Sequence, residues 1–165
     1  SLLEANGAGS VLAFGALTNL SGDLTWQMAI RAQAGGRIEL GEVSHLDDGL
    51  IYMLADGTNS TVTLTNVTAY TGSSRLISFE ARNAGSIQTP NLTDAHRATF
   101  TVRSGGALNL TQLTRARGFT VEGTAVTLPV LTNVNGGELT ALTGGSITFP
   151  ALTSFLDDSG CCGAA

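Results

Sequence analysis

The sequence predicts an all-β fold, a parallel β-helix (β-solenoid) of about seven coils of 18 to 26 residues. A nine-position phrase recurs along the chain: apolar, any, apolar, any, any, apolar, Ser or Thr, any, apolar. A period of this length is typical of a solenoid, in which each unit buries its apolar face against its neighbours. The seven copies begin at Leu12, Ile38, Val62, Ile87, Leu108, Val126 and Ile147, which are 26, 24, 25, 21, 18 and 21 residues apart.

The first half of a unit is a short alternating segment followed by a corner. Alternation of apolar and polar residues, with aromatic and β-branched side chains, predicts a strand with one face buried. These strands are expected at 28–31, 51–54, 77–80, 100–103 and 119–122. Gly-rich pairs such as Gly35-Gly36 and Gly105-Gly106 come next, and they supply the positive φ of a tight turn.

The second half of a unit is the nine-position phrase, which predicts two more short strands with a bend between them. Pro90, Pro129 and Pro150 occupy the same slot after the second apolar position, and proline cannot donate to a sheet ladder. Three strands and three corners describe one coil of a β-helix, and the bias of parallel crossovers favours a right-handed one. A leucine-rich-repeat solenoid is the alternative, although no unit contains a helix-forming run.

Two segments follow from this pattern: a repeat domain over 1–156 and a flexible Gly/Ala/Cys tail over 157–165. Cys161 and Cys162 lie in the tail, and adjacent cysteines rarely bond each other because their Cα atoms are too close. The chain begins inside a repeat, so we expect it to be part of a longer protein.

Equivalent positions of a solenoid stack into columns, and a hydroxyl column is filled in every copy of the phrase. We interpret it as a structural ladder of β-branched side chains beside a corner. A flat array for ice binding is the minor alternative, because the neighbouring column mixes many residue types. The column consists of Thr18, Ser44, Thr68, Thr93, Thr114, Thr132 and Thr153.

A second column is expected to be a ladder of alternating charges on the first strand of each unit. Exposed ion pairs each contribute only about 0–1 kcal/mol, so we interpret this ladder as a device that specifies register. Its charged members are Glu4, Arg31, Glu80, Arg103 and Glu122.

The composition argues against several classes of function. Net charge is −5 and all eight cations are arginines, which disfavours nucleic-acid binding, and no apolar run reaches the length of a membrane span. No nucleophile motif or single special coil suggests an enzyme, and no cofactor is expected. The acidic pairs Asp47-Asp48 and Asp157-Asp158 are the candidate Ca²⁺ ligands, although both suit solvated turns.

Residues 2–155 resemble the Gly/Thr-rich parallel β-helix repeats of bacterial secreted and cell-surface proteins, as in Gly36–Leu46 and Gly145–Phe155. The resemblance implies an extracellular structural or adhesive module, with flanking domains or other copies of the chain as partners. End-to-end self-assembly is one form of this hypothesis. A carbohydrate-binding or carbohydrate-active β-helix is the alternative, with polysaccharide as the partner and Trp26 and Tyr52 as an aromatic platform.

Overall fold

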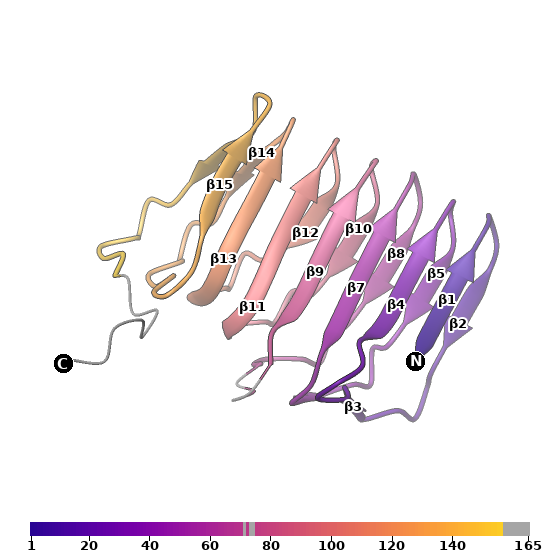
Figure 1. Cartoon of the computed structure of the whole chain (residues 1–165). Helices are drawn as coiled ribbons and strands as arrows, with labels where there is room; N and C mark the ends of the chain where they lie inside the picture. Colours follow the sequence, from indigo (N-terminus) through magenta and orange to yellow (C-terminus); the bar gives the residue numbers. More distant parts are fainter. Residues whose placement is uncertain (71, 73–74, 157–165) are drawn as a thin grey trace.

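The chain folds into a parallel β-solenoid of about 6 turns with roughly 23 residues per turn, as a computed structural model shows (Figure 1). The structure describes residues 1–70, 72 and 75–156. Within these ranges the fold is all-β and has no helix, which confirms the predicted fold class and removes the leucine-rich-repeat alternative. The expected tail at 157–165, with Cys161 and Cys162, lies outside the described residues.

The first side of the solenoid is a seven-stranded parallel sheet, whose strands lie next to one another along the rod (Figure 1). Every strand pairs with its equivalent in the next coil, so the sheet is continuous from one end of the described solenoid to the other. In spatial order its strands are β1 (Leu2–Asn6), β4 (Met28–Gln33), β7 (Ile51–Asp56), β9 (Ile77–Arg82), β11 (Asp94–Arg103), β13 (Arg115–Glu122) and β15 (Leu139–Leu142).

The second side contains the opening triplets of the nine-position phrase. Its strands form a five-stranded sheet and a separate two-stranded sheet, so pairing on this side is interrupted between β12 and β14. In chain order they are β2 (Val11–Ala13), β5 (Arg37–Glu39), β8 (Thr61–Thr63), β10 (Ser86–Gln88), β12 (Ala107–Asn109), β14 (Ala125–Thr127) and β16 (Ser146–Thr148).

The third side is the least regular. Two short strands, β3 (Asn19–Ser21) and β6 (His45–Asp47), pair in the first coils. Single parallel bridges continue this side from Ala69 to Ser154. In the later coils the third side runs directly into β11 and β13, which are therefore 10 and 8 residues long.

One hydrophobic core runs along the inside of all three sides. The apolar positions of the phrase are buried through the central coils, with Ile38, Val62 and Ile87 fully inaccessible to solvent. Phenylalanines stack at the centre: the ring centroids of Phe79 and Phe100 are 5.1 Å apart, and Phe119 follows at the same spacing. Each copy of the nine-position phrase therefore contributes one layer of the hydrophobic core.

The corner between the first and second sides explains the paired glycines. In the second coil Ala34 has φ 49° and Gly35 has φ 88°, and the backbone closes through a hydrogen bond from Gly36 N to Gln33 O. A Cβ on Gly36 would lie 2.1 Å from the carbonyl oxygen of Ala5 in the coil before, so only glycine fits there. The second glycine of the pair is thus required by a close approach, and the positive φ falls on the two residues before it.

The bend between the second and third sides is a tight turn with its proline where expected. Leu92 N donates to Thr89 O, and Leu152 N donates to Phe149 O, so Pro90 and Pro150 each follow the first residue of a four-residue turn. Proline favours this position because its fixed φ matches the turn.

Candidate functional site

The hydroxyl column is a ladder that ties successive coils together. Thr93, Thr114 and Thr132 each donate their side-chain hydroxyl to the backbone carbonyl of the column member in the preceding coil, over 3.0, 2.8 and 3.2 Å. The backbone of the same residues is bonded between coils as well. These hydroxyls therefore serve coil-to-coil contacts.

The neighbouring column gives a mixed surface. Register aligns Asn19 with His45, and it continues from Ala69 through Asp94 and Arg115 to the last coils. Amide, imidazole, methyl, carboxylate and guanidinium groups follow one another at the same position. Such an alternation offers no regular hydroxyl lattice.

The charge column expected from the sequence is divided between two columns of the first sheet. Register places Glu4 beside Arg31 and Glu80 beside Thr101, whereas Arg103 lies beside Arg82 and Glu122. The expected neighbours Glu80 and Arg103 are thus two residues apart in register, because Phe100 stacks on Phe79 and sets the alignment. Arg103 and Glu122 still form an ion pair at 3.5 Å.

A polar network covers the outer face of the first sheet around β7 and β9. Tyr52 donates its hydroxyl to Glu80 Oε2 over 2.7 Å, and Arg82 reaches Asp56 at 2.8 Å and Glu80 at 3.5 Å. Burial, with the hydrogen bond to Glu80 and its charge, raises the pKa of Tyr52 to about 12. Burial opposes ionisation of Asp56, but hydrogen bonds from Arg82 and Asn83 lower its pKa below the usual value.

The junction between the third side and the next strand of the first sheet is where the coils differ most; we call it the loop corner. The sequence predicted bulges at 21–27 and 71–75. The first lies at this junction, whereas 71 and 73–74 of the second lie outside the described residues. The turn of the second coil lies between them: Leu50 N donates to Asp23 O over 2.9 Å, and Arg75 N donates to Asp48 Oδ1 over 3.1 Å. The loop corner consists of 21–27, 47–50, 70, 72, 75–76, 95–98, 116–118 and 134–138.

The two aromatic residues of the expected platform differ in their surroundings. Trp26 is 74 % exposed on the first loop, where Asp23 Oδ1 accepts hydrogen bonds from Thr25 N and Trp26 N. These two backbone donors lower the pKa of Asp23. Tyr52 is half-buried on β7 and engaged with Glu80, and among the described residues no hydrogen bond or ring stacking joins it to Trp26.

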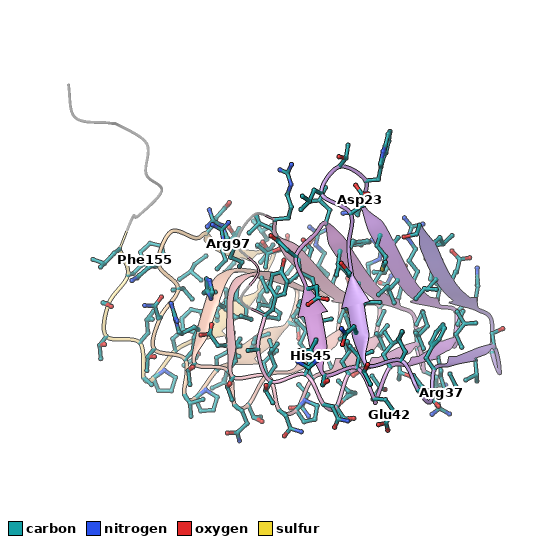
Figure 2. All side chains as sticks on the ribbon, turned by 90° about the horizontal axis from the view of Figure 1, so that it is seen from below. Asp23, Arg37, Glu42, His45, Arg97 and Phe155 are labelled. Carbon is teal, nitrogen blue, oxygen red and sulfur yellow. The ribbon has the colours of Figure 1, made fainter. Side chains whose placement is uncertain are left out.

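A polar hollow of about 260 Å³ lies farther along the loop corner, and the sequence did not single it out. Figure 2 shows Arg97 on the same long edge of the rod as Asp23. The sequence could have indicated it, because Arg115 and Arg117 follow the hydroxyl column two residues apart and therefore face outward on the same side of one strand. We call this the arginine hollow, lined by His96, Arg97, Arg115, Arg117, Asn133 and Asn135.

Two further findings concern metals and membranes. The described residues contain no group of three or more His, Cys, Asp or Glu side chains able to hold a metal ion. In the same part of the chain, no helix has the length and apolar character needed to cross a membrane.

The fold defines a class, that of the parallel β-solenoids. Comparison with protein-family models, with curated proteins and with solved structures finds no match to this chain.

Proposed function

We propose that this chain is a structural and interaction module of a larger extracellular protein: a rigid rod that presents its loop corner as an adhesive surface. The observation that carries the proposal is the first sheet, in which seven parallel strands pair without interruption over one core. Bending such a rod would break ladder hydrogen bonds and open the core. The described parts of the loop corner lie along one long edge of the rod, as Asp23 and Arg97 show (Figure 2), which suits a scaffold that displays a contact surface.

The chemistry of the first sheet favours a non-catalytic role. The carboxylates of Glu80 and Asp56 on this face are engaged by Tyr52 and Arg82, which stabilises their charged forms. The bacterial secreted and cell-surface repeats that the sequence resembles also suggest an extracellular location. Antibody staining of intact source cells tests this location: staining that requires permeabilisation would contradict it.

An adhesion assay tests the contact surface. Beads coated with the chain would be flowed over polysaccharides, matrix proteins and apolar surfaces, with a Leu24→Ser/Trp26→Ala variant beside the wild type. Both side chains are more than half exposed on the first loop, so the variant should fold and attach less. Val130→Ser, a change of an exposed residue away from the loop corner, is the control. Failure of wild-type beads to attach to any surface would contradict the adhesive role.

Carbohydrate binding is a second candidate, favoured by Trp26. An exposed indole is unusual for a purely structural surface, and aromatic faces commonly pack on sugar rings. A glycan array should detect binding that Trp26→Ala abolishes. Glycan binding that the Trp26→Ala substitution leaves unchanged would contradict the aromatic platform.

End-to-end association is a third candidate, based on the two edges of the first sheet. Among the described residues, β1 and β15 each pair on one side only. Leu2 and Val11 are exposed at one end of the solenoid, and Leu142 and Phe155 at the other. Parallel edges of this kind could continue the sheet into a second copy, head to tail. Sedimentation of the isolated chain as a monomer at all concentrations would exclude this.

A further inference from the structure

The arginine hollow is built from outward-facing residues of three successive coils, and a register shift in the first of them turns two adjacent residues outward. Arg115 and Arg117 lie in the middle coil, His96 and Arg97 in the coil before, and Asn133 and Asn135 in the coil after. Arg115 is bridged to Asn133 by register, and neighbouring strands lie about 4.8 Å apart. The lining side chains are therefore held over a span of about 10 Å by the solenoid itself.

The hollow concentrates positive charge on an acidic chain. It holds three of the eight arginines, whereas the net charge of the whole chain is −5. Asp94 is the neighbouring carboxylate, 3.0 Å from Arg115 Nη1 and 3.2 Å from His96 Nδ1. The three guanidinium groups outnumber the nearby carboxylates, which are Asp94 and, in the adjoining hollow that Arg117 also lines, Glu138.

Two of the three guanidinium groups remain available. Arg97 and Arg117 are half-buried, and neither guanidinium group makes an ion pair or a hydrogen bond within the described ranges. A guanidinium is a rigid fork of donors without an acceptor, and it matches the geometry of a carboxylate, phosphate or sulfate.

The two asparagines add neutral donors to the same hollow. Asn133 Oδ1 accepts a hydrogen bond from Asn135 N, and Asn135 Oδ1 accepts one from Leu156 N. Because backbone N–H groups occupy both amide oxygens, the free ends of these side chains are NH₂ donors. The hollow therefore presents three guanidinium groups and two amide NH₂ groups as donors, beside the imidazole of His96, whose Nδ1 faces Asp94.

We propose that the arginine hollow binds an oxyanion group, a carboxylate, phosphate or sulfate. Its volume of about 260 Å³ is below that of a typical drug-sized site, so it suits one charged group or a small polyvalent anion. Arg97 and Arg117 would grip the oxygens bidentately, and Asn133 and Asn135 would donate to those that remain. Oxyanion binding at this hollow does not depend on the proposed role of the chain as a rigid adhesive rod.

Calorimetric titration of the full chain tests the proposal. Inorganic phosphate, sulfate and citrate would be compared with chloride at constant ionic strength. We expect saturable binding of at least one of the three oxyanions, weakened at least about tenfold by Arg117→Gln, because a charge-assisted bidentate contact is lost. Citrate as the tightest probe assigns the site to carboxylates, and phosphate or sulfate as the tightest assigns it to tetrahedral oxyanions.

Two variants distinguish a specific site from general charge. Arg37→Gln removes an exposed arginine from the second side and should leave binding unchanged. Asp94→Asn releases Arg115 and should tighten binding several-fold, a gain that a merely structural role would not produce. If circular dichroism shows that the Arg117→Gln variant is unfolded, the Arg97→Gln variant is titrated in its place. No saturation beyond chloride, or equal weakening by Arg37→Gln, would overturn the proposal.

Discussion

At the scale of single residues, the paired glycines of the corners have two separate reasons. Gly105 adopts φ 74° in open space, whereas a Cβ on Gly106 would lie 2.1 Å from Ala81 O. The sequence correctly predicted turns there and assigned the glycines to positive φ. It could not reveal the contact with the preceding coil, because that contact joins residues about one coil apart.

A glycine substitution tests this close approach. Gly36→Ala should lower the free energy of unfolding by about 1–3 kcal/mol, because the new methyl group forces two coils apart. Gly15→Ala is the matched control: its Cβ would meet nothing within 4 Å, so its effect should be near zero or slightly stabilising. Urea denaturation measures both, and equal losses in the two variants would contradict the explanation.

The pKa of Tyr52 predicts an alkaline loss of stability. Its folded value of about 12 lies above the ordinary 10.0, so the fold favours the neutral phenol. This contribution is complete below pH 10 and is lost as the pH rises through 12. The stability difference between wild type and Tyr52→Phe should therefore be constant up to pH 10 and shrink above it. A difference independent of pH between 9 and 12 would show that Tyr52 titrates normally.

The two columns expected from the sequence had different outcomes in the structure. The hydroxyl column stacks as expected because it follows the phrase, whose apolar residues fix its register. The predicted charge column was wrong at Arg103. The prediction matched each strand to the next by its last residue, whereas in the structure the buried pair Phe79 and Phe100 sets the register. Register in this fold follows the buried side chains.

At the scale of elements, the predicted strands of the first side exist and are longer than expected. The alternating segment at 100–103 is the end of β11, which begins at Asp94. The extension arises because the later units are short and leave few residues for a loop after the third side. Periodicity alone cannot place such a merger, since both segments alternate in the same way.

The phenylalanine stack is the element on which we expect the central coils to depend most. Phe100 lies between Phe79 and Phe119, with ring centroids 5.1 Å away on both sides, and is 1 % exposed. Phe100→Ala should cost about 3–5 kcal/mol of unfolding free energy. Phe155→Ala, at a position that is 52 % exposed, should cost far less. A small loss for Phe100→Ala would mean that the core repacks freely.

At the scale of the whole molecule, the sequence predicted the solenoid and the bulge at 21–27. It did not predict that this bulge shares the loop corner with the arginine hollow, because the residues of that hollow are spread from His96 to Asn135. The coil brings them together, and a linear pattern of three to nine residues does not contain that information.

The central claim is that the chain forms one rigid rod of stacked coils, and a distance between its ends tests it most directly. Glu4 and Thr140 occupy the same outward column of the first sheet, and six strand-to-strand steps separate them. Spin labels would be attached at these two positions after replacement of Cys161 and Cys162 by alanine. Double electron–electron resonance should give one narrow distribution of label-to-label distances, centred at about 29 Å and unchanged by salt. A broad distribution, or a distance far from this value, would contradict the rod.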